Sequence, residues 1–275
     1  MNFHENELVS LYLSDLKELE VSRTSKQIIQ LYLHPLLGKI LIINGEIQHI
    51  EHYQCIYHEM LVHLPMAFIP KPQHALIIGG GSLFAAHEVL KYSTIKTLDL
   101  CDHDPSVISL MEKHYAHARE VLSDGRFHYI NSDAREFLGT ANVKYDIIIN
   151  DCFNVIKTAM HNGMTLSDHL LEMLTEEGVC SDIIYRHIFD KSTTVTTLKK
   201  MSNYSNVCFS LVTVPEYPGI LHIETLWGKN QNLTQDARII FNVEQSNKDM
   251  FQYYNPHMIP YYLYIPRYIK RLFTQ

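Results

Sequence analysis

The sequence has no apolar segment long enough to cross a membrane. Its longest apolar runs, at residues 40–43, 75–78 and 145–149 (the last interrupted by Asp146), fall far short of the ~20 residues that a membrane-spanning helix needs. Residues 1–10 carry two glutamates and lack the basic start and apolar centre of a signal peptide. We therefore expect neither a secretory signal nor a membrane partner.

Cysteine is scarce and shows no motif. The five cysteines among 275 residues stand far apart, without a Cys-x-x-Cys pair, and an odd number cannot pair completely. This usage is typical of a reducing compartment rather than of a disulfide-linked secreted domain. The sequence therefore predicts a cytoplasmic protein with free thiols.

Basic residues are in the minority. Lys and Arg number 23 against 30 Asp and Glu, which gives a formal charge of −7. Because nucleic acid requires a basic face, this balance argues against a nucleic-acid partner and favours a cationic ligand. Histidine is abundant, but the pairs His114/His117 and His58/His63 lack the Glu or Cys that would complete a zinc site, so we predict no metal.

Residues 1–65 are predicted to form a small antiparallel β domain. The dipeptide Asn44-Gly45 between two apolar segments is the strongest short-range signal of a hairpin. Apolar side chains at helical spacing then indicate a helix that leads out of the domain. The expected elements are strands at 27–33, 39–44 and 46–50 and a helix at 57–66.

Residues 66–275 are predicted to form a second domain, in which strands and helices alternate. Such alternation favours a mostly parallel, doubly wound sheet. Two late strands, at 206–214 and 221–227, are too close in sequence to be parallel. The pattern therefore indicates an α/β fold with a Rossmann-like, methyltransferase-type sheet that ends in an antiparallel hairpin. The other expected elements are strands at 75–78, 95–100, 127–131, 145–150 and 179–184 and helices at 83–92 and 105–115.

Polar residues follow several of these strands. Gly79-Gly80-Gly81 comes directly after the first strand and allows a sharp turn and a close approach to a ligand. An acid at the end of the second strand, Asp102, stands where such folds hold a ribose, although Phe84 breaks the full glycine pattern. Because ligands of open α/β sheets bind outside the carboxyl ends of the strands, the sequence predicts a nucleoside site there.

Several motifs resemble the spermidine synthase (polyamine aminopropyltransferase) family, of which the chain looks like a diverged member. The block Tyr57-His58-Glu59-Met60 followed by His63 and Pro65 is the most specific, since the family signature is Tyr-His-Glu-Met-x-x-His-x-Pro. The other matching segments are residues 43–48 (Leu-Asp-Gly-Val-x-Gln in the family), 145–151 (Tyr-Asp-x-Ile-x-x-Asp), 214–217 (Pro-Thr-Tyr), 253–256 (Tyr-Tyr-Asn) and 266–267.

The resemblance implies a donor, decarboxylated S-adenosylmethionine, and an acceptor diamine such as putrescine, in a homodimer. It implies Asp102 at the ribose and Asp133 and Ala134 at the adenine. Around the donor it implies Gln27, His58, Gly79, Gly81 and Ser82. The residues implied at the reacting amine are Asp151, Tyr57 and Tyr217, which we predict as catalytic groups. Asn154 and Glu216 stand in the same segments but differ from the family pattern, and we predict them as substrate-binding groups. Glu216 or Tyr217 could share the proton transfer with Asp151.

Two departures from the family pattern leave alternatives open. The glycine loop of the family reads Gly-Gly-Gly-Asp-Gly-Gly, and in this chain Ser82 replaces the aspartate. A second family loop reads Asp-Ser-Ser-Asp-Pro, and in this chain Asn154 replaces its second aspartate. An amide cannot accept a proton as that aspartate would. The first interpretation is still aminopropyl transfer. The alternatives are transfer of a methyl or aminocarboxypropyl group from intact S-adenosylmethionine, or a nucleoside-binding protein without catalysis.

Overall fold

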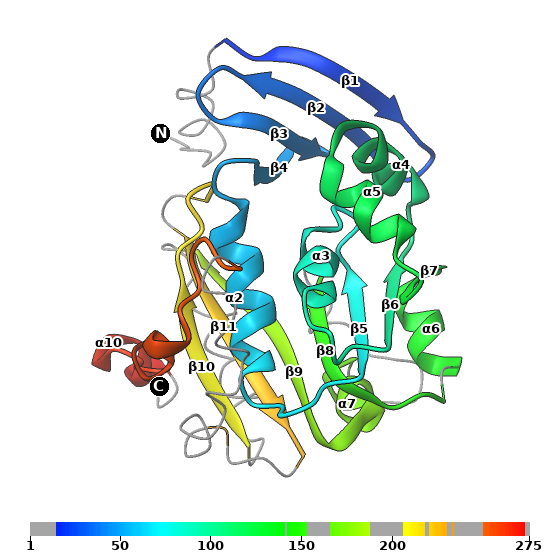
Figure 1. The fold of residues 1–275 in the computed structure, drawn as a ribbon. Coiled ribbons are helices and arrows are strands. Elements are labelled where there is room, and N and C mark those ends of the chain that lie inside the picture. Colours follow the sequence, from blue (N-terminus) through cyan, green and yellow to red (C-terminus); the bar gives the residue numbers. More distant parts are fainter. Residues whose placement is uncertain are drawn as a thin grey trace.

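The computed structural model describes residues 15–140, 142–152, 166–187, 206–217, 220–229, 233 and 250–272. These residues form a small antiparallel sheet and a larger mixed sheet that carries helices on both faces (Figure 1). Within them, no helix is long and apolar enough to span a bilayer.

The small sheet has the strand order β1-β2-β3-β4, and all its pairs are antiparallel. Asn44 and Gly45 adopt φ angles of 52° and 84° in the tight turn between β3 and β4, which confirms the predicted hairpin. The strand β1 was not predicted, because only Leu19 and Val21 interrupt its polar sequence. The strands are β1 (Lys17–Arg23), β2 (Ile28–His34), β3 (Gly38–Ile43) and β4 (Glu46–Ile50).

The large sheet has the order β10-β11-β9-β8-β5-β6-β7. Its five strands from β7 to β9 are parallel, and β11 and β10 complete it as an antiparallel pair, as predicted. The strands β5 and β8 read as apolar runs because helices cover both faces of the sheet. The strands are β5 (His74–Gly79), β6 (Thr97–Asp102), β7 (Phe127–Asn131), β8 (Tyr145–Asp151), β9 (Leu174–His187), β10 (Val207–Val212) and β11 (Ile220–Gly228).

Helices α2 (Gln54–Met66) and α3 (Phe84–Leu90) pack against each other on one face of the large sheet. Helices α6 (Ala134–Thr140) and α7 (Leu166–Met173) contact each other, and they contact β6 and β9 respectively. All residues of α2 from position 58 onward are buried, so this helix lies within the core. The remaining helices are α4 (Pro105–His114), α5 (Ala116–Ser123), the short η3 (Pro256–Met258), α9 (Ile259–Tyr262) and α10 (Arg267–Leu272).

The buried carboxylate of Glu59 on α2 fastens the C-terminal segment beside this helix. Its Oε1 accepts the backbone N–H of Gln252 at 2.8 Å, and its Oε2 accepts those of Tyr253 and Tyr254 at 2.8 and 2.7 Å. Helix α2 thus joins the small sheet, the large sheet and the C-terminal segment. The predicted domain boundary, between residues 1–65 and 66–275, falls within this helix and stays a prediction.

Candidate functional site

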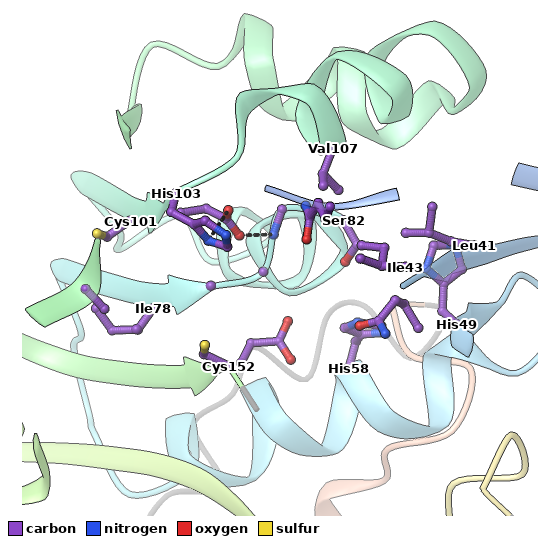
Figure 2. Close-up of a pocket in the computed structure, with 18 of the residues that line it drawn as sticks. Leu41, Ile43, His49, His58, Ile78, Ser82, Cys101, His103, Val107 and Cys152 are labelled. Carbon is purple, nitrogen blue, oxygen red and sulfur yellow. Dashed lines mark hydrogen bonds and ion pairs between the residues drawn. The ribbon is translucent and has the colours of Figure 1, made fainter. Parts of the chain in front are cut away.

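A cavity of about 500 Å³ lies where the carboxyl ends of β5, β6 and β8 meet the small sheet and α2. Figure 2 shows Cys101 and His103 at one end and Leu41, Ile43 and His49 at the other. Asn154 lies outside the described residues. The other residues singled out from the sequence all line this cavity: Gln27, Tyr57, His58, Gly79, Gly81, Ser82, Asp102, Asp133, Ala134, Asp151, Glu216 and Tyr217.

The turn after β5 brings backbone to the cavity wall. Gly79 and Gly80 both have φ of 77°, a conformation that glycine adopts without strain. A Cβ atom on Gly79 would lie 2.7 Å from the carbonyl oxygen of Asp151, so a side chain has no room there. Glycine is therefore required at position 79 by the close approach of β5 and β8, and it is favoured at position 80 by the positive φ.

The carboxylate of Asp102 is held by two backbone donors. The N–H of Gly81 donates to Oδ2 at 3.2 Å, and that of Asp104 donates to Oδ1 at 2.9 Å. Each oxygen keeps a lone pair for a ligand hydroxyl. Asp104 also caps α4 by accepting the N–H of Ser106 at 3.0 Å, and it accepts the hydroxyl of Thr24 at 3.1 Å, which places the turn that carries Gln27 against the cavity.

At the end of β7, Asp133 is paired with Arg135. The guanidinium lies 2.9 Å from Oδ2, and this hydrogen bond holds the pKa of the carboxyl at about 2. Asp133 is therefore ionised at neutral pH, and it retains lone pairs beyond those that Arg135 uses. The backbone of Ala134 follows at the start of α6.

Asp151 ends β8 beside the first turn of α2. The hydroxyl of Tyr57 donates a hydrogen bond to its Oδ1 at 2.8 Å. Burial and the negative charge of Asp102 raise the pKa of the Asp151 carboxyl to about 7, although the hydrogen bond from Tyr57 opposes the shift. A carboxyl with a pKa near neutrality changes easily between its proton-donating and proton-accepting forms.

The turn after β10 closes the cavity from the other side. The hydroxyl of Tyr217 donates to the carbonyl oxygen of Ile47, and Oε1 of Glu216 accepts the N–H of Ile50 at 3.1 Å. Both contacts join residues about 170 positions apart in sequence to strand β4. Burial, together with nearby carboxylates, raises the pKa of Tyr217, so its hydroxyl stays protonated.

The sulfur atoms in the cavity are not nucleophiles. Burial raises the pKa of both Cys101 and Cys152 to about 12, so each is a neutral thiol at neutral pH. Among the described residues there is also no group of three or more possible metal ligands.

Comparison with known proteins assigns the family. The model of the spermine/spermidine synthase domain matches residues 54–237, which is more than half of the chain. The chain belongs to the spermine/spermidine synthase family. The match begins at α2 and ends beyond β11, so it includes most of the residues around the cavity.

Curated relatives agree with this assignment, and a solved structure shares the fold. A polyamine aminopropyltransferase of Lachnospira eligens is 36% identical over 174 residues, which are 62% of this chain and 59% of that protein. One of Buchnera aphidicola subsp. Acyrthosiphon pisum (strain Tuc7) is 27% identical over 266 residues, which cover 92% of this chain and 90% of that protein. The crystal structure of spermidine synthase from Thermotoga maritima superposes with a TM-score of 0.79 at 23% identity, covering 94% and 87% of the two chains, and shows the same fold.

The chain departs from the family motif where Ser82, Leu83 and Phe84 follow the three glycines. Leu83 has a φ of 62°, which is unusual for a residue with a side chain, and it is completely buried. Phe84 stacks on His117 with ring centres 4.0 Å apart, and Nε2 of His117 lies 3.1 Å from the carbonyl oxygen of Ser82. Aromatic packing thus replaces glycine in this turn.

Two more imidazoles, which line the cavity, contact Phe84. Ring centres of His49 and His58 lie 4.7 and 5.1 Å from that of Phe84. Burial lowers the pKa of His58 to about 4, and it lowers the pKa of His49 and of His117 as well. All three rings are therefore neutral at pH 7, so the cluster around Phe84 is held by packing rather than by charge.

Sequence reasoning missed several residues that line the cavity. Gln48 stood in the quoted hairpin motif but was given no role, whereas His49 and Gln54 carried no recognised pattern. The missed polar residues are Gln48, His49, Gln54, Cys101, His103, Ser132, Arg135 and Cys152.

Proposed function

We propose that this protein transfers an aminopropyl group from decarboxylated S-adenosylmethionine to a diamine such as putrescine. Family membership and the names of the curated relatives, polyamine aminopropyltransferases, support this activity. A matching solved structure is described as spermidine synthase in complex with the transition state analogue AdoDATO. The observation that carries the proposal is the Tyr57–Asp151 pair inside the cavity, whose carboxyl has a pKa of about 7.

The nucleoside of the donor would lie over the carboxyl ends of β5, β6 and β7. Asp102 would accept the ribose hydroxyls, since each of its oxygens keeps a free lone pair. Asp133 would accept the adenine amino group while the N–H of Ala134 donates to a ring nitrogen. Gly79 and Gly81 allow the ligand to approach the backbone, and Gln27, His58 and Ser82 complete the donor surroundings.

The reaction is a displacement at carbon. The lone pair of the acceptor amine forms a bond to the propyl carbon attached to the sulfonium, and the carbon–sulfur bond breaks with its electron pair passing to sulfur, which becomes a neutral thioether. The amine must first lose the proton of its ammonium form, whose pKa is ~10. Asp151 would take this proton, because Asn154 cannot act as a base.

Tyr57 and Tyr217 would orient the acceptor and exclude water. The hydroxyl of Tyr57 is fixed on Asp151, and the hydroxyl of Tyr217 is fixed on the backbone of β4, so both rings hold defined positions. Alignment of the two reactants supplies most of the rate in such a transfer, because the sulfonium already activates the carbon.

Mass spectrometry of products tests the proposal. Incubation with decarboxylated S-adenosylmethionine and putrescine should yield spermidine and 5′-methylthioadenosine, whereas intact S-adenosylmethionine should yield no alkylated amine. D151N should lower kcat/KM at least 100-fold, within the range of general base catalysis. Products from intact S-adenosylmethionine alone would favour methyl or aminocarboxypropyl transfer. A bound donor without product across a panel of amines would favour the non-catalytic alternative.

The assembly and location of the protein are part of the proposal. Tyr261, Tyr264 and Tyr268 are 70, 69 and 62% exposed near the C-terminus, and a second copy covering them would form the expected homodimer. Sedimentation at micromolar concentration tests this. The five cysteines all have free thiols, which supports a cytoplasmic location.

A further inference from the structure

Glu216 lines the cavity and carries an unsatisfied carboxylate oxygen. The residue is 4% exposed, and its Oε1 accepts the N–H of Ile50. Its Oε2 is buried and has no hydrogen-bond partner among the residues that the structure describes. A buried carboxylate oxygen without a donor is costly. Because Glu216 lines the cavity, a bound ligand is in a position to supply that donor.

Gln54 offers a second acceptor in the same region. It lines the cavity from the first turn of α2, and within the described part of the chain its buried Oε1 also lacks a partner. The turn in which Tyr53 N–H donates to Ile50 O links the end of β4 to this helix. Gln54 therefore stands four positions beyond Ile50, whose N–H Glu216 accepts, and both side chains line the same cavity with an oxygen able to accept a hydrogen bond.

The Asp151 carboxyl and Tyr217 line the same cavity as Glu216. The hydroxyl of Tyr217 donates to the carbonyl oxygen of Ile47 on β4, the strand that ends at the Ile50 N–H which Glu216 accepts. Asp151 is held by Tyr57 and Glu216 by Ile50, so each carboxylate has its own partner in the protein. Two separated acids facing one cavity match a ligand with two cationic ends.

We propose that Glu216, with Gln54, binds the distal ammonium of the acceptor while the reacting amine lies at Asp151. This inference rests on the proposed aminopropyl transfer and adds the residue that selects a two-ended acceptor over a monoamine of equal length. The matching family segment reads Pro-Thr-Tyr, so the carboxylate at position 216 distinguishes this chain from the family pattern. Removal of its charge should lower diamine affinity because hydrogen bonds to charged groups are stronger than neutral ones.

The test compares 1,4-diaminobutane with 1-aminobutane as acceptors. E216Q keeps an amide oxygen for the N–H of Ile50 but removes the charge. The ratio of kcat/KM for the diamine over the monoamine should fall about 10- to 100-fold in E216Q, mainly through KM of the diamine. A partly folded preparation slows both acceptors alike, so the ratio is independent of folding yield. E46Q is the control, because the charge of Glu46 raises the pKa of Tyr217 as that of Glu216 does, although Glu46 does not line the cavity. The diamine-to-monoamine ratio of kcat/KM in E46Q should equal that of the wild type.

The outcomes separate this inference from the proposed function. An unchanged ratio in E216Q, or a wild-type ratio near one, would overturn the role of Glu216 while leaving aminopropyl transfer intact. If no amine gives product, the proposed function fails, and thermal shift decides on Glu216. In that case, stabilisation of the wild type but not of E216Q by 1,4-diaminobutane supports the inference. Equal stabilisation, or none in the wild type, contradicts it.

Discussion

Replacing Asp151 by Asn should make the protein inactive and more stable at once. The carboxyl has a pKa of about 7 in the folded protein against ~3.9 in an unfolded chain. Between these values the folded state retains a proton that the unfolded state has lost. Wild-type stability therefore falls as pH rises through this interval, and the full cost is present above pH 7. Asn avoids that cost and still offers an oxygen to the hydroxyl of Tyr57.

The size of the effect follows from the shift. About three pKa units at ~1.36 kcal/mol per unit correspond to ~4 kcal/mol above pH 7, as an upper bound. Relaxation of water and protein dipoles around the ionised carboxylate reduces this value. We expect D151N to gain about 1–3 kcal/mol in unfolding free energy at pH 8, or roughly 3–10 °C in Tm, and much less at pH 5.

Thermal denaturation of wild type and D151N at pH 5 and pH 8 measures this directly. E18Q, which removes an exposed carboxyl from β1, is the matched control and should shift Tm little at either pH. A D151N gain that is equal at both pH values, or a variant less stable than wild type at pH 8, would refute the assignment of a costly buried charge to this residue.

Three further predictions concern residues that build the site. G79A should lower the unfolding free energy by more than ~2 kcal/mol in urea titrations, because it forces a Cβ atom against backbone at a positive φ. G125A is the control: a Cβ atom there meets open space, and its unfolding free energy should stay within about 0.5 kcal/mol of the wild-type value. D102N leaves one of two backbone donors unpaired, so calorimetry should show 5′-methylthioadenosine binding about 10- to 100-fold more weakly; an unchanged Kd contradicts this. E59Q replaces one of the two carboxylate oxygens that accept the backbone N–H groups of residues 252–254 with an NH₂ group, which cannot accept them. Hydrogen exchange at residues 252–254 should then accelerate at least tenfold. Unchanged protection would show that Glu59 does not hold this segment.

Local sequence signals predicted most of the fold. Apolar segments bounded by glycine or aspartate marked β5, β6 and β8, and Asn44-Gly45 marked the first hairpin, because each of these signals acts over a few residues. The strand β1 was not predicted because its sequence is polar. It forms because its backbone pairs with β2, a contact that its own residues do not indicate. Topology then brought the strand ends together in one cavity, as the parallel sheet requires.

The sequence did not predict the contacts in and around the site that join residues far apart in the chain. The rings of His49, His58 and His117 meet on Phe84 from three different elements. Similarly, Glu216 reaches the N–H of Ile50 from 166 positions away. No short-range pattern encodes such contacts, and the raised pKa of Asp151 results from burial that exists only after folding.

The residues that line the cavity come from segments between Gln27 and Tyr217, so the cavity exists only when most of the chain has folded. A compound that fills the cavity binds the native state and has no site on the unfolded chain. At a concentration 100 times its Kd, it would add ~2.7 kcal/mol to the unfolding free energy. Because cellular proteases degrade unfolded chains, the lifetime of this protein would rise and fall with the supply of its own ligands.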